Sequence, residues 1–401
     1  MTGRFRKWFS KNPLPAFNSL AVAILTSLII PGSYSVAEPK TLPAFLNKTE
    51  HVLTIVHPGD PTAKPMSYTL VQARGKDGEP SGYSMWVDSV ICREKTCDVV
   101  KVQLHWDALG HYQRYEVALG SKLTKLDHVP FTEEDLAKLQ AILKDPDSPL
   151  KEVEKESMTA KTPSSPGKPV DGVAAVSQPT VLTLKTAVII GAGYTCYDLW
   201  HWSNGLLTGH IRDFTGKHCS EKKLITYLTS ASNDSALFAL KYSRKRRITD
   251  ANFFEAVIDR AGKGDETLIK PALAYLRETA PTDQTYYDSI VSLFSEADSK
   301  KRLLILEAVV SDPQKPVVGF YDQLCDYLPE LESYYEVHLF LNLMEKRNGS
   351  SSKVAEKATE LLKHPKFFIS RRAYWYLEKQ TLPVNLKKSA EAFYIKNKDR
   401  L

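Results

Sequence analysis

The sequence carries little net charge for its length. Its 401 residues have a formal net charge of +6, and four units of this come from Arg4, Arg6, Lys7 and Lys11. The remainder therefore carries only +2, which gives no reason to expect a nucleic-acid partner. Because a single hydrophobic core rarely grows to this size, the length predicts two domains.

A long apolar run is also missing near the N-terminus. The run Leu20–Ile30 is too short to span a bilayer comfortably. It follows the basic residues, is broken by Pro31 and Gly32, and precedes the small residues Ser35–Ala37. This order is typical of a signal peptide over residues 1–37 and predicts export, with the periplasm as the destination. An uncleaved membrane anchor is the alternative. The lack of a twin Arg favours the general export route, and the lack of a following Cys disfavours a lipid anchor.

The sequence has only five cysteines, and all of them follow residue 37. Export permits disulfides, but an odd count leaves at least one thiol over. Cys92 and Cys97 flank the four residues REKT between two strand-like runs. A hairpin loop of this length would place them opposite each other, within reach of a disulfide. Two free, buried thiols are the alternative.

Strand patterns dominate the first part of the chain. In Val99–Trp106, apolar and polar residues alternate, which predicts a strand with one buried face. Residues 82–92 and 111–119 are similar, and His51–Val56 adds a further strand upstream. Short connections between these runs favour an antiparallel sheet.

Helical patterns follow the strands. Thr132 and Asp135 form a capping pair for a helix that Pro146 ends. Residues 158–179 are rich in Pro and Ser and are predicted to form a linker. The apolar run over residues 181–202 is then long enough for one buried helix. Together these features predict an α+β domain over residues 38–157 and 180–215.

The second half contains a repeat of 33 residues. Thr249–Ala261 and Thr282–Phe294 share their opening Thr-Asp and their apolar positions. Asp265 and Leu273 return 33 residues later as Asp298 and Leu306. Each unit is an amphipathic helix pair, and such pairs stack because neither helix can bury its apolar face alone. The pattern predicts an all-α solenoid of about five helix pairs over residues 216–401. It resembles a divergent HEAT array, and it lacks ankyrin and tetratricopeptide signatures. Solenoids usually bind protein partners.

Two glycine-containing segments resemble nucleotide-binding motifs only in part. Gly191 and Gly193 follow an apolar run, but Cys196 replaces the third glycine of a dinucleotide fingerprint and no second strand follows. Close approach between helices is the favoured interpretation, and a dinucleotide-dependent enzyme is the alternative. Gly209 and Gly216 are too far apart for a phosphate loop.

Polar side chains in the same region suggest no familiar site. His201, His210, His218 and Cys219 are potential zinc ligands, but their spacing matches no common metal site, so no metal is predicted. The basic run Lys241–Arg247 ends a predicted helix, where cations offset the helix dipole. A solvated helix end is favoured over a site for an anionic partner.

The segment DGVAAVS, residues 171–177, resembles the attachment motif of exported FMN-binding domains, which carry flavin covalently. That motif runs Asp-x-x-Ser/Thr-Gly-Ala-Thr, with FMN esterified to the last residue. Asp171 matches the acid, and Ser177 stands at the acceptor position. Ala174, Ala175 and Val176 replace Ser-Gly-Ala, which removes the permissive glycine. The similarity extends over about residues 80–210 and does not include the solenoid.

This resemblance implies a flavin-carrier-like domain, and two hypotheses follow. The favoured one is an exported accessory or scaffold protein, rather than an enzyme, which has lost covalent FMN and binds a protein partner through its solenoid. The second is an electron carrier with FMN esterified to Ser177, working in an envelope redox complex. In that case the flavin would supply the chemistry and the protein would tune it.

Overall fold

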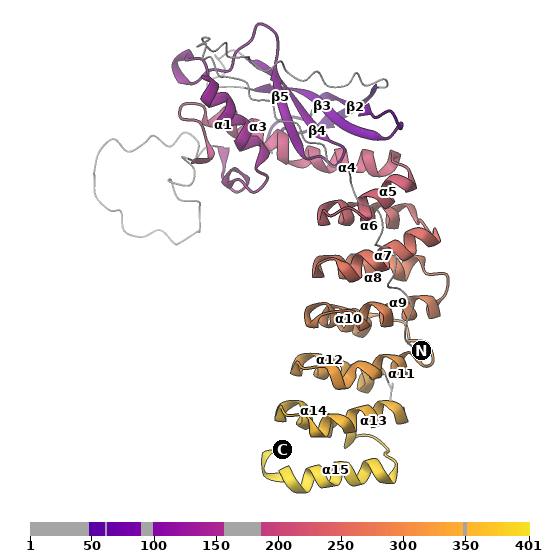
Figure 1. The fold of residues 1–401 in the computed structure, drawn as a ribbon. Coiled ribbons are helices and arrows are strands. Elements are labelled where there is room, and N and C mark those ends of the chain that lie inside the picture. Colours follow the sequence, from indigo (N-terminus) through magenta and orange to yellow (C-terminus); the bar gives the residue numbers. More distant parts are fainter. Residues whose placement is uncertain (1–47, 61, 90–98, 156–185, 348–350) are drawn as a thin grey trace, which may run out of the picture. The chain divides into compact units, whose positions relative to one another are not determined.

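The computed structural model describes residues 48–60, 62–89, 99–155, 186–347 and 351–401. An antiparallel sheet comes first and helices follow, many of them in stacked pairs (Figure 1). The expected fold class, an α+β part followed by an all-α solenoid of helix pairs, is confirmed. In the described part of the chain, no helix has the length and hydropathy that crossing a bilayer requires.

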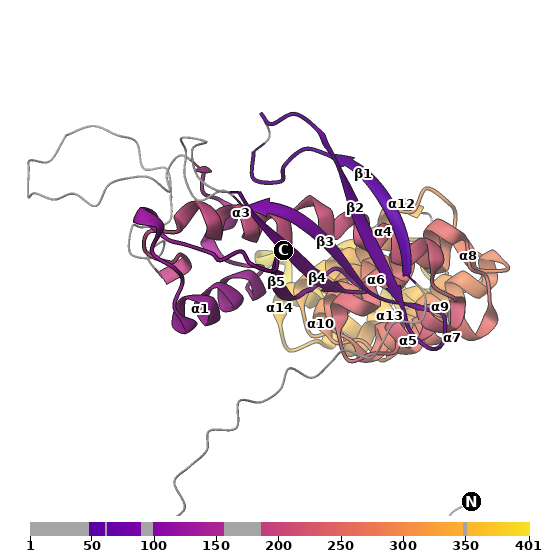
Figure 2. The same ribbon diagram turned by 90° about the horizontal axis from the view of Figure 1, so that it is seen from above.

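The sheet is a meander in which neighbouring strands are also consecutive in sequence (Figure 2). Residues of β4 alternate between the two faces as predicted: Val100, Val102, Leu104 and Trp106 are at most 4% exposed. The strand β2 was not predicted, whereas the other four lie within or overlap the expected runs. In the described residues the sheet has five strands: β1 (Lys48–Ile55), β2 (Met66–Arg74), β3 (Pro80–Ser89), β4 (Val100–Asp107) and β5 (Tyr112–Val117).

Two helices from far along the chain contribute to the core beneath the sheet. They are α3 (Gly193–Asn204) and α4 (Leu206–His218), whose apolar residues share one core with the strands. The Trp106 indole Nε1 donates to the Ser203 carbonyl oxygen at 2.8 Å, and the Tyr83 hydroxyl lies 3.0 Å from Thr215 Oγ1. The buried polar groups of this interface therefore lock the helices onto β3 and β4.

The helix α1 (Glu133–Lys144) lies beside β5 and carries the predicted cap. Thr132 Oγ1 accepts from the Asp135 amide at 3.2 Å, and the Asp135 carboxylate accepts from the Thr132 amide at 3.0 Å. The helix ends at Lys144, just before Pro146, as expected. Gln140 Nε2 donates to the Gln113 carbonyl oxygen of β5 at 2.7 Å, so α1 also satisfies part of that sheet edge.

The prediction of one long helix over residues 181–202 is wrong. Within the described part of this run, α3 begins only at Gly193. Gly191 has a φ of 81°, a conformation that ends regular helix and that glycine adopts without strain. Its carbonyl oxygen accepts from the Leu126 amide at 2.8 Å. Gly191 therefore forms a turn against a neighbouring loop rather than a close contact between helices.

From α5 onward, the helices of the described residues form five pairs and a further helix. First helices contact first helices of the next pair, and second helices contact second helices. The apolar residues of all pairs join one extended core. The pairs are α5 (Glu221–Leu228) with α6 (Asn233–Arg246), α7 (Ala251–Lys263) with α8 (Ile269–Thr279), α9 (Asp283–Ser295) with α10 (Ser299–Ser311), α11 (Phe320–Leu324) with α12 (Tyr334–Arg347), and α13 (Ser352–Glu360) with α14 (Phe367–Leu377); α15 (Val384–Asn397) follows.

The 33-residue register is visible in the buried positions. Phe254 and its equivalent Tyr287 are both buried, and so are Leu273 and Leu306. Asp265 and Asp298 each cap the helix that they precede, because their side chains accept from a backbone amide of the first turn. The caps of α7 and α9 differ by one residue: Asp250 caps the first and Thr282 the second. The core positions thus keep the period more strictly than the helix starts do.

Candidate functional site

A tight turn between β4 and β5 forms the first part of the site. Asp107 Oδ1 accepts from the amides of Leu109 and His111 at 2.8 and 2.9 Å. Gly110 has a φ of 83°, which the turn requires. Asp107 Oδ2 then lies 2.9 Å from His111 Nδ1, so the same carboxylate shapes the turn and orients the imidazole.

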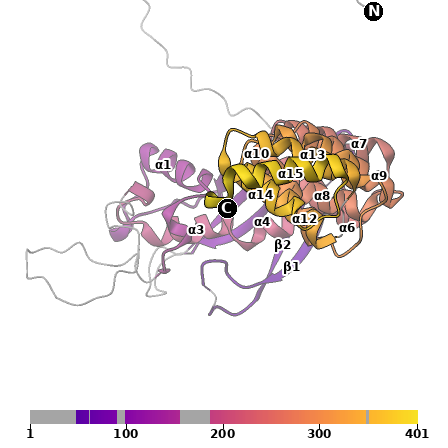
Figure 3. The same cartoon turned by 90° about the horizontal axis from the view of Figure 1, so that it is seen from below.

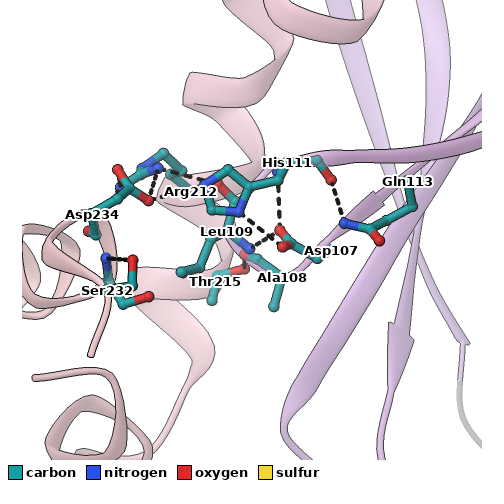
Figure 4. Close-up of polar contacts among 10 residues, drawn as sticks. Asp107, Ala108, Leu109, His111, Gln113, Arg212, Thr215, Ser232 and Asp234 are labelled. Carbon is teal, nitrogen blue, oxygen red and sulfur yellow. Dashed lines mark hydrogen bonds and ion pairs between the residues drawn. The ribbon is translucent and has the colours of Figure 1, made fainter. Parts of the chain in front are cut away.

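His111 connects this turn to the first helix pair of the solenoid (Figure 4). Its Nε2 lies 3.0 Å from Asp234 Oδ2, at the start of α6. Arg212 of α4 binds the same carboxylate through two nitrogens, at 2.9 and 3.0 Å. Arg212 also donates to the Leu109 carbonyl oxygen at 3.3 Å. Three elements that are distant in sequence therefore meet at one carboxylate.

The charges at this junction reinforce one another. Hydrogen bonds to Asp107 and then Asp234 raise the pKa of His111 to about 9, against the effect of partial burial. The hydrogen bond from His111, together with Arg212, holds the pKa of Asp234 well below its usual range despite partial burial. Both ring nitrogens of His111 donate to carboxylates, so the imidazole is a cation at neutral pH. It is consequently a tether and not a free general base.

A buried hydroxyl supports the junction from below. Thr215 Oγ1 donates to the Ala108 carbonyl oxygen at 2.5 Å and accepts from the Tyr83 hydroxyl at 3.0 Å. Both side chains are almost completely buried, at 0 and 2% exposed. Because an unpaired buried hydroxyl is costly, this chain of hydrogen bonds fixes the hairpin on α4.

An open cleft of about 810 Å³ lies beside the junction. At the edge of the cleft, one carboxylate oxygen of Glu79 accepts a hydrogen bond from the Ser220 backbone amide at 3.0 Å. Ser220 is the residue that immediately precedes α5. Charged and polar side chains line the cleft together with apolar ones such as Pro80 and Leu109. Its lining includes Lys76, Asp77, His111, Lys223, Tyr227 and Ser235.

A second cluster of charges lies on α3. Asp198 is 2% exposed, and its carboxylate oxygens lie 2.7 and 2.9 Å from Lys155 Nζ. His57 Nε2 is 3.9 Å from the same carboxylate. Burial raises the pKa of Asp198 and lowers that of His57 to about 4. The imidazole is therefore neutral, and the Lys155–Asp198 ion pair is one of several contacts that attach the segment after α1 to α3, beside the hydrogen bond from the Trp200 indole to the Asp145 carbonyl oxygen.

The residues singled out for flavin attachment, Asp171 and Ser177, lie outside the described residues. So do Cys92 and Cys97, and their disulfide stays a prediction. Residues 1–37, the expected signal peptide, are likewise outside. The other three cysteines, which lie in the described part, are free and buried.

Two of the histidines considered as metal ligands, His201 and His218, bind different backbone carbonyl oxygens. His201 Nε2 lies 3.1 Å from the Leu150 carbonyl oxygen, and His218 Nδ1 lies 2.8 Å from that of Phe214. Among the described residues, no group of three or more potential ligands is close enough to hold a metal ion.

The glycine and basic segments have structural roles. A Cβ at Gly216 would clash with the Tyr242 ring, so Gly216 allows α4 to approach α6. A Cβ at Gly209 would meet nothing within 4 Å. In the basic run, Lys245 pairs with Asp213 at 3.1 Å, and Arg244 pairs with Glu278. The last turn of α6 thus binds neighbouring helices, as well as being exposed to solvent in part.

Comparison with protein-family models, with curated proteins and with solved structures found no match for this chain.

Sequence reasoning missed the junction residues His111, Arg212 and Asp234. One local signal existed, because an Asp four residues before a His, with Gly between them, is typical of a turn that the Asp side chain closes. The partners across the junction gave no signal, since Asp234 follows His111 by 123 residues.

Proposed function

We propose that this chain is an exported accessory protein that binds a protein partner through its helix-pair solenoid. In this proposal the sheet, with α3 and α4, is a rigid extension fixed to the first helix pair by the His111 junction. The hydrogen bonds of the junction favour a fixed orientation, because they connect one strand turn to two helices. A scaffold benefits from such rigidity, since less freedom is lost on binding.

The observation that carries this proposal is a group of exposed aromatic side chains on two adjacent second helices. Tyr334 and Tyr335 begin α12 and are 41 and 49% exposed, and Phe368 near the start of α14 is 62% exposed. Lys366 Nζ donates to the Glu332 carbonyl oxygen at 2.7 Å, which ties the two helix starts together. These three aromatic residues are the aromatic patch.

An arginine adds to the aromatic patch. The Arg371 guanidinium lies 5.5 Å from the Phe368 ring and 4.7 Å from the Trp375 ring. Tyrosine, tryptophan and arginine are the residues that contribute most to binding energy at protein interfaces. Exposed aromatic rings held by neighbouring contacts also lose little entropy on binding. The patch therefore fits a protein surface with apolar side chains.

A photo-crosslinking residue placed next to the aromatic patch, at Glu332, tests the proposal in native cells. We expect one main crosslinked product, which the triple substitution Y334A, Y335A and F368A abolishes. The matched control is Trp86→Ala, which removes an aromatic side chain that is 43% exposed on β3 and should leave the product unchanged. A product that survives the triple substitution would rule out the patch as the binding surface.

The second function, an electron carrier with FMN esterified to Ser177, is supported by the resemblance over residues 80–210. We expect little or no attached flavin, because Ala175 and Val176 replace small motif residues. In-gel flavin fluorescence of the native protein measures this directly. A bright band that disappears in Ser177→Ala would make the electron carrier the better proposal.

A further inference from the structure

The helix α15 buries one side and exposes the opposite one. Leu386 and Ala390 are its buried residues. At 3.6 residues per turn, positions 384, 388, 391 and 395 fall within roughly 60° of one another, on the side opposite those two. We call these four residues the outer stripe: Val384, Lys388, Glu391 and Ile395.

The outer stripe is open to solvent in the described part of the chain. Val384 and Ile395 are each 73% exposed, and α15 is the foremost helix in the view from below (Figure 3). After α15 the chain turns back, since the Arg400 guanidinium lies 3.8 Å from the Phe367 ring of α14. Lys388 and Glu391 have no ion-pair partner among the described residues. Two large apolar groups and two unpaired charges thus lie along one line.

The order of the outer stripe is complementary to itself. Along the helix the four residues are apolar, positively charged, negatively charged and apolar. When a second copy of α15 is placed antiparallel on this side, each positive charge therefore lies opposite a negative charge. Val384 then meets Ile395 of the second copy, and Lys388 meets Glu391 of the second copy. A two-fold axis repeats both contacts, as an isologous interface requires. An unrelated partner helix would have to match this spacing by chance.

We propose that the outer stripe is a homodimer interface, in which two copies of α15 pack antiparallel about a two-fold axis. The inference goes beyond the proposed partner binding and does not depend on it, because the aromatic patch is made by other helices. A helix of 14 residues is only about 21 Å long. Such a contact is smaller than the roughly 800 Å² per partner of a stable interface, so the dimer should be weak, with a dissociation constant in the micromolar range.

Reversing one charge and then both tests the register. In Glu391→Lys, each of the two symmetry-related contacts between positions 388 and 391 brings two lysines together. We therefore expect the dissociation constant of the dimer to rise at least about tenfold. The double variant Lys388→Glu with Glu391→Lys restores opposite charges at both contacts. We expect its dimer dissociation constant to lie within about threefold of that of the unsubstituted protein. The matched control, Glu255→Lys, makes the same charge change at an exposed position of α7 and should have no effect.

Sedimentation velocity at protein concentrations from about 1 to 500 µM measures the dimer dissociation constant of the purified protein and of each variant. Thermal unfolding checks that each variant keeps its fold, as expected for exposed positions. A protein that stays monomeric throughout this range would overturn the proposal. So would a dimer that Glu391→Lys leaves intact, or a double variant that associates no better than the single one.

Discussion

Replacing His111 by glutamine removes the cation that joins the strand turn to α6. A rise in the pKa of His111 from 6.5 to about 9 corresponds at face value to roughly 3 kcal/mol of stabilisation. The imidazole and the Asp234 carboxylate are 49 and 46% exposed, so solvent screening reduces this contribution to about 1 kcal/mol. We therefore expect His111→Gln to lower the free energy of unfolding by about 1 kcal/mol at pH 6.5.

The pH dependence of this contribution has a definite sign. The pKa of His111 is higher in the folded protein than in the unfolded chain, so its stabilisation is complete below about pH 6.5. It decreases as the pH rises and is lost above about pH 9. The difference in unfolding free energy between the natural protein and His111→Gln should accordingly shrink to near zero over this range. Other titrating groups cancel in that difference.

Urea unfolding at pH 6.5, 7.5 and 9.5 provides the measurement. Tryptophan fluorescence reports mainly on the part containing the sheet, where Trp106, Trp200 and Trp202 are buried, with Trp375 of α14 as the one contribution from the helix pairs. Circular dichroism follows the helices, because two cores need not unfold together. The control is His210→Gln, at an exposed position of α4. An identical pH slope in the natural protein and in His111→Gln would refute the junction as a charged tether.

Three further predictions concern single positions. Gly216→Ala should lower the free energy of unfolding by about 1–3 kcal/mol, because the added methyl group overpacks against Tyr242. Gly209→Ala in the same helix should raise it by about 0.5–1 kcal/mol, because its methyl group meets nothing and alanine favours helix. Denaturant unfolding of both variants measures the difference. Peptide mapping without reductant should find Cys92 bonded to Cys97, and free alkylation of both thiols in oxidised native protein would exclude the bond. Sequencing of the native N-terminus should begin near Glu38; recovery of residue 1 would indicate an anchor.

Local patterns were sufficient to predict much of the fold. The alternation in β4, the capping pair of α1 and the 33-residue register each depend on near neighbours, and each is present in the structure. The strand β2 escaped prediction because its pattern is mixed. Gln72 is completely buried beside Leu70, and its side-chain oxygen lies 2.9 Å from His51 Nε2. A polar residue that hydrogen-bonds inside a core looks like a surface residue in a sequence.

The errors elsewhere have equally physical causes. The run over residues 181–202 has the composition of a helix, but Gly191 adopts a positive φ there, and its carbonyl oxygen accepts a hydrogen bond from the distant Leu126 amide. Composition does not report such a long-range contact. The junction depends on contacts of the same kind, since Arg212 and Asp234 lie more than 100 residues beyond the turn that they hold. Contacts between residues so far apart in the sequence can be seen only in the folded structure.

The late position of α3 and α4 in the chain has a consequence for folding during synthesis. Hairpins form within microseconds, so β1–β5 can pair as soon as they emerge. The apolar face that they share with α3 and α4 is not complete until Ser203 and Thr215 arrive, 97 and 132 residues after Trp106 and Tyr83. At ordinary synthesis rates, 100 residues take about 5–20 s. Throughout that interval Leu70, Met85 and Leu104 belong to a surface that α1 covers only in part, and such a partly exposed apolar surface can aggregate or bind a chaperone. Each later helix pair closes on its predecessor after about 33 residues, so the nascent chain is most vulnerable while residues 118–192 are being made.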